Sequence, residues 1–279
     1  MTFGAATQAK IDEIVVASER HGTDSIIVLS GVAGTGKTCL ALAAAQKYAK
    51  HPFFVKQIQF HQSFSYEDFV EGLRPTAAGG FEPRSGIFLE WNEAALRDPG
   101  NQYVLLVEEF TRANITAVLG ELMTYIEYRD RLFETPLTRR RIKVASNITI
   151  IATMNPQDRT ALEVDDALIR RLRIVECPPS TMQLREMLDG VKQDIVDRLA
   201  ALFDECQKKH PDTFNDLMPF GHGMFAGVKT EQDLTRLWHQ RIKHLLRRNP
   251  QVPAHTYSRD IEGLYPWRNS TAAGEAREN

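Results

Sequence analysis

Residues Gly31 to Thr38 read Gly-Val-Ala-Gly-Thr-Gly-Lys-Thr, and the rest of the chain is organised around this stretch. It fits the phosphate-loop pattern G-x-x-x-x-G-K-[ST] at every fixed position. The β-branched run 25–30 before it predicts a buried strand, and the Ala- and Leu-rich segment 39–49 after it predicts a helix. A glycine loop at the start of a helix binds anions through backbone N–H groups and the helix dipole. A glycine turn without this role is the alternative, and both flanks argue against it.

The loop predicts specific contacts with a nucleoside triphosphate. Lys37 would reach the β- and γ-phosphates, and the hydroxyl of Thr38 would hold Mg²⁺. Backbone amides of the loop would bind other phosphate oxygens. The predicted phosphate-binding residues are Gly31, Val32, Ala33, Gly34, Thr35, Gly36, Lys37, Thr38 and Cys39.

Composition and charge narrow the class of protein. The chain has 279 residues, of which 43% are hydrophobic and 25% charged, as in ordinary globular proteins. Its formal net charge of −2 gives no overall basic field that would point to nucleic acid. Three scattered cysteines without C-x-x-C spacing argue against a zinc site or disulfide framework and favour a reducing compartment. Because no apolar leader or long apolar stretch is present, we expect a cytoplasmic protein without a membrane span.

Further buried strands are predicted at 55–60, 103–107, 147–153 and 172–177, and the strand at 103–107 closes on Glu108 and Glu109. A hydrophobic strand that ends in two acids is typical of Walker B, in which the first acid assists Mg²⁺ and the second orients the attacking water. The first acid is usually Asp, so the carboxylate of Glu108 lies about one bond length farther from the backbone. Two solvated acids are the alternative, and the phosphate loop upstream argues against it.

Two more positions are expected near these acids. The strand predicted at 147–153 runs into Asn155, whose amide could sense the γ-phosphate and hold the attacking water. Residues 165–171 predict a short helix that ends in Arg170 and Arg171. Together with Glu108 and Glu109, these residues form a predicted set of polar groups that follow the strands.

A basic run, residues 139–143, lies in a hairpin-like insertion predicted at 129–144. A solvated surface is the default interpretation of such a run, and contact with DNA or a partner is the alternative. Upstream, Ser65 and Asp68 resemble a capping box, and the helix that they start is predicted to end at Gly72 and Pro75.

The remaining local signals predict three regions. Residues 1–177 form an αβα core, 178–248 a helical lid, and 249–279 an extended or partly disordered tail without periodicity. Within the core, 76–85 is predicted as a loop and 115–128 as one amphipathic helix.

The order of these parts resembles that of AAA+ NTPases, and four segments narrow the resemblance to the McrB-like branch, related to MoxR-type ATPases. McrB is the motor subunit of modification-dependent restriction systems. The similar segments span His61–Pro75, Glu108–Ile115, Met154–Thr160 and Phe220–Phe225. The resemblance implies an αβα P-loop sandwich with a five-stranded parallel sheet and a small C-terminal helical lid.

The resemblance also implies roles for single residues. Arg112 and Arg159 would lie at or near a subunit interface, and Arg170 or Arg171 would be an arginine finger that reaches a neighbour's γ-phosphate, with ordinary salt bridging as the alternative. His222 would contact the base or pack the lid. The implied catalytic residues are Glu109, Asn155, Arg112, Arg159, Arg170 and Arg171, and the implied metal ligands are Thr38 and Glu108.

The implied activity is hydrolysis of ATP, with GTP as the alternative, by a ring that is expected to be a hexamer. A separate McrC-like nuclease would cut foreign DNA, which would be met through that partner or through the basic run. McrB has an N-terminal module that reads modified cytosine, and we expect none in the residues before the first strand here. Two rival functions stay open: a MoxR-like chaperone that remodels a protein complex, and a slow nucleotide-dependent assembly switch.

Overall fold

The computed structural model describes residues 3–19, 26–158, 166–248 and 254–268. The chain divides into two compact units, which we describe one at a time. The core unit comprises Ala9–Ser30 and Lys37–Val175, and the lid unit comprises Met1–Gln8, Gly31–Gly36 and Glu176–Asn279. The division at 175/176 lies two residues before the expected boundary, but the grouping of the N-terminus and most of the glycine loop with the lid unit was not expected.

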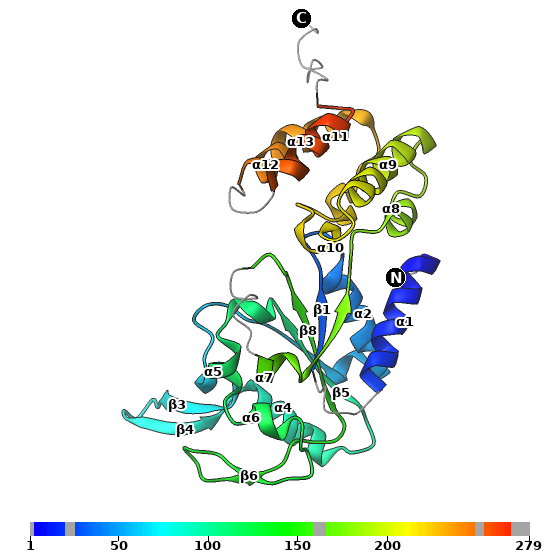
Figure 1. Cartoon of the computed structure of the whole chain (residues 1–279). Coiled ribbons are helices and arrows are strands. Elements are labelled where there is room, and N and C mark those ends of the chain that lie inside the picture. Colours follow the sequence, from blue (N-terminus) through cyan, green and yellow to red (C-terminus); the bar gives the residue numbers. More distant parts are fainter. Residues whose placement is uncertain (1–2, 20–25, 159–165, 249–253, 269–279) are drawn as a thin grey trace, which may run out of the picture. The chain divides into compact units, whose positions relative to one another are not determined.

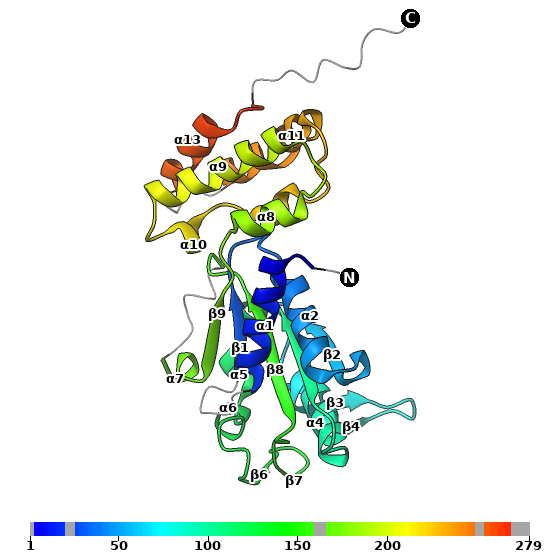
Figure 2. The ribbon, with the colours of Figure 1, turned by 90° about the vertical axis from the view of Figure 1, so that its right-hand side faces the viewer.

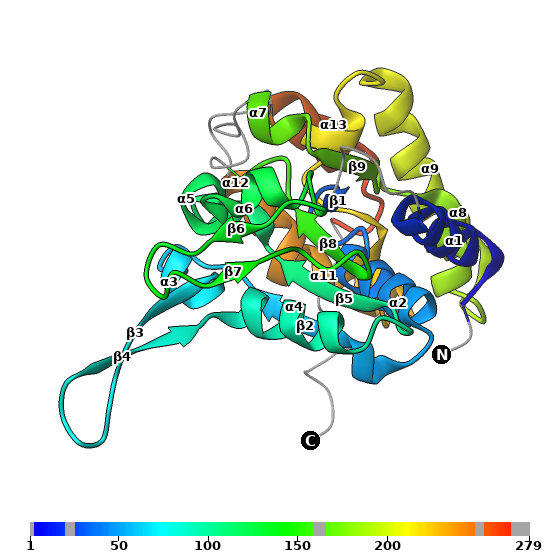
Figure 3. The same cartoon turned by 90° about the horizontal axis from the view of Figure 1, so that it is seen from below.

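The core unit is built on a five-stranded parallel sheet with the strand order β2-β5-β8-β1-β9 (Figures 1 and 3). This confirms the predicted fold class. The strands are β1 (Ile26–Ser30), β2 (Val55–Gln59), β5 (Tyr103–Glu108), β8 (Ile148–Met154) and β9 (Leu172–Glu176). In register, Ser30 pairs with Met154, Val107 with Ala152, and Gln59 with Glu108, so the carboxyl ends of four strands meet at one edge.

Helices cover both faces of this sheet (Figure 3). On one face lie α2 (Lys37–Ala49), which buries its alanine- and leucine-rich stripe, and beside it the core-unit part of α1 (Ala5–Glu19). Asp12 of α1 and Lys47 of α2 form an ion pair at 2.5 Å. On the other face lie α4 (Ile87–Arg97), α5 (Ile115–Leu119), α6 (Leu122–Tyr125) and α7 (Asp166–Ile169). The large core cluster of this unit lies between these helices and the sheet.

The segment after β2 differs from its prediction. The capping box is present at Ser65 and Asp68, but helix α3 (Tyr66–Phe69) is one turn long. The chain then forms an antiparallel hairpin of β3 (Glu71–Pro75) and β4 (Phe81–Ser85), which projects from the unit (Figures 1 and 3). Gly79 and Gly80, with φ of 83° and 91°, make the turn of this hairpin. Residues 76–85, predicted as a loop, therefore contain this turn and strand β4.

The helix predicted at 115–128 is also wrong in its length. It is split into α5 and α6 at Gly120, whose φ of 51° no α-helix contains. A second hairpin follows, with β6 (Phe133–Glu134) and β7 (Arg141–Ile142), as the predicted insertion required. Two single turns of 3₁₀-helix complete the unit, Pro52–Phe54 (η1) and Phe110–Arg112 (η2).

The lid unit is helical in the described residues after β9. Figure 2 shows α9, α11 and α13 side by side, and their apolar faces form a separate core. The elements are α8 (Thr181–Met187), α9 (Gln193–Lys209), α10 (Phe214–Leu217), a 3₁₀ turn His222–Phe225 (η4), α11 (Glu231–Leu237), a π-helical turn Trp238–Ile242 (η5), α12 (Lys243–Arg248) and α13 (Ala254–Leu264). None of the helices in the described residues is long and apolar enough to span a membrane.

Helix α13 corrects the predicted tail, since residues 254–268 belong to the lid core. Tyr257, Tyr265 and Trp267 are almost fully buried. The ring of Tyr265 stacks on Trp238 with centroids 4.9 Å apart, and its hydroxyl donates to the carbonyl of Leu234 at 2.9 Å. Burial of three large aromatic side chains stabilises the helix, because each removes 150–250 Å² or so from water.

Candidate active site

The hydroxyl of Thr38, on the first turn of α2, donates to the Oε2 atom of Glu108 at 2.9 Å. Glu108 is the last residue of β5, and its other carboxylate oxygen accepts from the amide of Gln57 on the neighbouring strand β2. The structure therefore brings the end of the phosphate loop and the first Walker B acid together, as their positions in the sequence predicted.

Glu109 leaves the strand in a strained conformation. Its φ of 54° and ψ of 43° lie in the left-handed region, which a residue with a Cβ enters at a cost of roughly 1–3 kcal/mol. Its backbone amide is held by the hydroxyl of Thr153 on β8, at 3.3 Å. Such strain at the end of a buried strand is typical of functional positions.

The carboxylate of Glu109 is engaged by an arginine of the same chain. The Nε atom of Arg112 donates to it at 3.0 Å and lies 3.9 Å from the carboxylate of Asp158. Burial raises the pKa of Asp158 above its usual range, the charge of Arg112 opposes that rise, and the charge of Glu109 adds to it. Two acids thus share one guanidinium beside the strand ends.

Asn155 follows β8 directly and lies in a turn. Its side-chain oxygen accepts from the amide of Gln157 at 3.1 Å, and its carbonyl accepts from the amide of Asp158 at 3.0 Å. The turn fixes the Asn155 side chain at the same edge of the sheet as Glu109, because β8 and β5 are neighbours in parallel register.

The oxygen atoms at this edge suit a magnesium ion. Mg²⁺ prefers oxygen ligands and binds through one or two protein groups together with substrate phosphates. The Thr38 hydroxyl and the Glu108 carboxylate are such groups and are already in contact. Glu108 in place of the usual Asp does not prevent that contact.

The glycine part of the loop belongs to the lid unit. Gly34 and Gly36 both have a φ of 81°, which requires glycine, and the Thr35 hydroxyl donates to the Val32 carbonyl at 3.1 Å. Cys39, on α2 in the core unit, is exposed.

The two candidate arginine fingers differ sharply. The Nε atom of Arg171 lies 3.0 Å from the carboxylate of Glu127, and both side chains are only about a tenth exposed. The Arg171 carbonyl also accepts from the amide of Ile26, so this residue supports the sheet edge. Arg170 is exposed. Of the pair, Arg170 is therefore the one available to another molecule, and salt bridging accounts for Arg171.

Arg159 and His222, the other two residues with predicted roles, also have different outcomes. Arg159 lies outside the described residues. His222 is buried in the lid unit, where its Nδ1 atom accepts from the amide of Ser180 at 3.1 Å. Burial lowers the pKa of His222 to about 4, so the imidazole is neutral at pH 7. This geometry favours the lid-packing role over a contact with the base.

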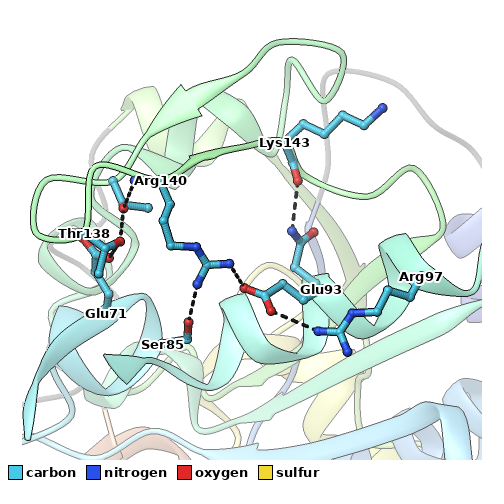
Figure 4. Close-up of polar contacts among 9 residues, drawn as sticks. Glu71, Ser85, Glu93, Arg97, Thr138, Arg140 and Lys143 are labelled. Atoms are coloured by element: carbon cyan, nitrogen blue, oxygen red, sulfur yellow. Dashed lines mark hydrogen bonds and ion pairs between the residues drawn. The ribbon is translucent and has the colours of Figure 1, made fainter. Parts of the chain in front are cut away.

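The basic run is tied to acids of the same unit (Figure 4). Arg140 pairs with Glu93 of α4 and donates to Ser85 at 3.1 Å, while Arg97 also pairs with Glu93. The remaining pairs join Glu134 to Arg139 at 3.3 Å and to Arg141 at 3.8 Å. Two acids thus offset half of the charge of these four arginines, three of which belong to the run, so the run is a partly compensated surface.

The loop that carries this run is anchored by a buried acid. Glu71 is 2% exposed, and its carboxylate accepts from the amide of Leu137 at 2.6 Å and from the hydroxyl of Thr138 at 2.6 Å (Figure 4). These hydrogen bonds lower the pKa of Glu71 against the opposing effect of burial, so the acid stays charged.

Sequence reasoning missed several residues of the site. Gln57 and Thr153 gave no signal, because polar residues within strands are common and only the register brings them to the acids. Asp158 stood inside a recognised segment without a role. Its position next to a candidate interface arginine could have suggested an acidic partner for Arg112.

Comparison with known proteins decides the family. A family model described as the AAA domain of the dynein-related subfamily matches residues 26–172, more than half of the chain. The chain belongs to this family. The matched part of this AAA protein contains the strand-end acids, Asn155 and both arginines of the predicted pair.

Curated relatives confirm the resemblance to the McrB branch. The AAA protein is 39% identical over 179 residues to the type IV methyl-directed restriction enzyme EcoKMcrB subunit of Escherichia coli K12, covering 60% of this chain and 39% of that relative. It is 23% identical over 186 residues to the type II restriction enzyme BsuMI component YdiS of Bacillus subtilis 168, covering 52% of this chain and 54% of the relative. The matches thus span about half or less of each relative.

Among solved structures, NtrX from Brucella abortus is similar at 12% identity and a TM-score of 0.43, covering 98% of this chain and 54% of that one. A likeness this slight carries no argument about function.

Proposed function

We propose that this AAA protein hydrolyses a nucleoside triphosphate, with ATP as the favoured substrate and GTP as the second. The observation that carries the proposal is the contact between Thr38 and Glu108, at 2.9 Å, with Glu109 as the next residue. A phosphate-loop hydroxyl, a metal-binding acid and a water-activating acid then stand at one sheet edge, as phosphoryl transfer to water requires.

Each residue has a distinct task in this proposal. Lys37 binds the β- and γ-phosphates, and Glu109 accepts a proton from the attacking water, which Asn155 orients. Bound Mg²⁺, held by Thr38 and Glu108, would neutralise charge on the phosphate oxygens. Arg170 of a neighbouring subunit completes the site, because a guanidinium stabilises charge that develops in the transition state. Arg112 must first release Glu109.

The assembly and partner are also proposed. The relatives' names place them in restriction enzymes, one as a subunit and one as a component. We expect a ring, a hexamer, that works with a separate McrC-like nuclease subunit in defence against foreign DNA. Because acids compensate residues 139–143 in part, DNA contact through the nuclease partner is favoured over contact through that run.

The test measures hydrolysis of Mg-ATP and of Mg-GTP by the parent protein and by Lys37→Ala, Glu109→Gln and Arg170→Ala. Each variant should lose activity. Mixtures of Lys37→Ala with Arg170→Ala subunits should regain part of it, because the intact phosphate loop of an Arg170→Ala subunit can then meet the intact Arg170 of a Lys37→Ala neighbour. If each single variant is inactive and no mixing ratio restores hydrolysis, the proposal of a site shared between subunits is contradicted. A parent that binds neither nucleotide would contradict the whole proposal.

One observation favours the slow assembly switch as a second candidate. The ion pair between Arg112 and Glu109 occupies the water-activating carboxylate within one chain. If that pair persists with nucleotide bound, turnover should fall below about 10⁻³ s⁻¹, comparable with an unassisted GTPase. Nucleotide-dependent assembly without faster turnover, measured by sedimentation and phosphate release on one sample, would support the switch over the motor.

A further inference from the structure

Two backbone amides of the lid unit hold the middle of the glycine loop. The amide of Gly221 donates to the carbonyl of Ala33, and the amide of Gly223 donates to the carbonyl of Gly34, both at 2.7 Å. All four residues belong to the lid unit although they are far apart in the chain. Both hydrogen bonds are short and join main-chain groups, so they define the orientation of two successive peptide groups of the loop.

The segment that supplies these amides is well anchored. Phe220 and Phe225 are fully buried on either side of it, with ring centroids 6.0 Å apart. Between them, the Nδ1 atom of His222 accepts from the backbone amide of Ser180. A segment fixed by two buried rings and by a hydrogen bond from Ser180 is a firm support for the loop that lies against it.

Close approach requires glycine at both positions of the lid segment that donate to the loop. A Cβ atom at Gly221 would lie 2.5 Å from the carbonyl oxygen of Gly34, and one at Gly223 would lie 2.8 Å from it. Gly221 has an ordinary extended backbone, with a φ of −94°, so conformational freedom is not the reason for glycine there. At the start of the loop, a Cβ at Gly31 would lie 2.2 Å from the carbonyl oxygen of Cys177.

The geometry of the peptide group gives these contacts a direction. In a planar trans peptide the C=O of one residue and the N–H of the next point to opposite sides. The Ala33 and Gly34 carbonyls face the lid segment, so the amides of Gly34 and Thr35 face away from it. Backbone amides of this loop are the groups that cradle phosphates in the phosphate-loop pattern.

We infer that Gly221 and Gly223 are positioning residues, which aim the Gly34 and Thr35 amides at the phosphate chain of a bound nucleotide. This inference rests on the proposed nucleotide site. By reciprocity of linked equilibria, a phosphate chain that binds these amides also stabilises the contact of the loop with segment 220–225.

The experiment measures the affinities of Mg-ADP and Mg-ATP for the parent, Gly221→Ala, Gly223→Ala and a matched control, Gly263→Ala. A Cβ at Gly263, in α13 of the same unit, meets no atom within 4 Å. Each Gly221 or Gly223 substitution should weaken the binding of both nucleotides about tenfold or more. Hydrogen bonds from backbone amides to charged phosphate oxygens are strong, and a tenfold change in affinity needs little free energy. The control should bind like the parent.

Hydrogen exchange of the nucleotide-free proteins separates positioning from general damage. In the Gly221→Ala and Gly223→Ala variants, peptides that cover 31–38 should exchange faster, while α9 and α13 should exchange as in the parent. Affinities within twofold of the parent would overturn the inference. Faster exchange across the whole lid unit, in step with the loss of affinity, would also overturn it.

Gly223→Ala decides the matter if Gly221→Ala does not fold, since it brings only the Gly34 carbonyl oxygen within 3.0 Å of the new Cβ. The two proposals fail in different ways. If the parent binds nucleotide, Lys37→Ala does not, and Gly223→Ala binds like the parent, only this inference is wrong. If the parent binds no Mg-nucleotide, both are wrong.

Discussion

The acids at the end of β5 and the arginines of residues 139–141 are both conspicuous runs of charge, but the fold treats them differently. Glu108 and Glu109 leave a buried strand and meet polar groups from α2, β2 and β8, with Glu109 in a strained conformation. The arginines lie on a surface hairpin, where acids of the same unit pair with them.

The difference shows that how firmly the fold holds a charged side chain matters more than how many charged residues lie together in the sequence. Groups at the carboxyl ends of parallel strands are positioned by the sheet, so they converge at little additional cost. Exposed ion pairs are worth about 0–1 kcal/mol each and leave their side chains free to exchange partners. Substitutions in the two regions should therefore differ in size and in kind.

The largest effect is expected at the strand end. Glu109→Gln should lower the rate of nucleotide hydrolysis about 10³-fold and leave nucleotide binding intact, because it removes the proton acceptor and keeps the shape. Phosphate release and nucleotide binding measured on the same sample check this. The matched control is Glu134→Gln, an acid of the basic hairpin, which should hydrolyse nucleotide at the parental rate. Equal losses in the two variants would remove the contrast between the regions.

The next effect contrasts a buried ion pair with an exposed neighbour. Arg171→Ala should lower the free energy of unfolding by about 3–5 kcal/mol, because it leaves the buried carboxylate of Glu127 without its partner. Chemical denaturation checks this value. Arg170→Ala, one residue away and exposed, should change the free energy of unfolding by less than about 0.5 kcal/mol. Similar values for the two variants would show that Arg171 is not a structural residue.

A pH experiment tests the buried imidazole of the lid unit. His222 has a pKa of about 4 in the folded protein against 6.5 for a free side chain, so the unfolded chain binds the proton more readily. The stability that this group contributes is therefore present above pH 6.5 and is lost as the pH falls to about 4, by roughly 3 kcal/mol in total. His222→Asn keeps an acceptor for Ser180 and does not titrate. Unfolding measured at pH 7.5 and at pH 5 should show a smaller loss in His222→Asn, and an equal loss would contradict the assignment.

The smallest effect is expected in the basic run. The double variant Arg139→Gln/Arg141→Gln should change the free energy of unfolding by less than about 1 kcal/mol, because both guanidinium groups are about three-quarters exposed and share one acid. Denaturant titration in low and high salt measures the change. A loss of more than about 2 kcal/mol that salt does not reduce would mean that the hairpin is as firmly supported as the strand ends.

Much of this protein could be predicted from local pattern. Apolar runs predicted the five strands, glycine spacing predicted the phosphate loop, and the residues directly after the strands predicted Glu108, Glu109 and Asn155 at one edge. These predictions hold because a parallel sheet brings the carboxyl ends of its strands together whatever the remaining sequence does. Helix α13 was missed, although Tyr257, Ile261 and Tyr265 recur every four residues, which is the spacing of a buried helical stripe.

Other features depend on contacts between residues far apart in the chain, and no local pattern contains them. Arg170 and Arg171 are adjacent and identical in type, yet a carboxylate more than forty positions upstream makes one of them a buried support. Gly221 and Gly223 carry no side chain to interpret, and they matter because the glycine loop lies within 3 Å of where a Cβ would be. Sequence pattern specifies which chemical groups follow which strands. Only the folded structure decides which charges are compensated and in which direction the backbone amides of the glycine loop point, because these properties depend on distances in space.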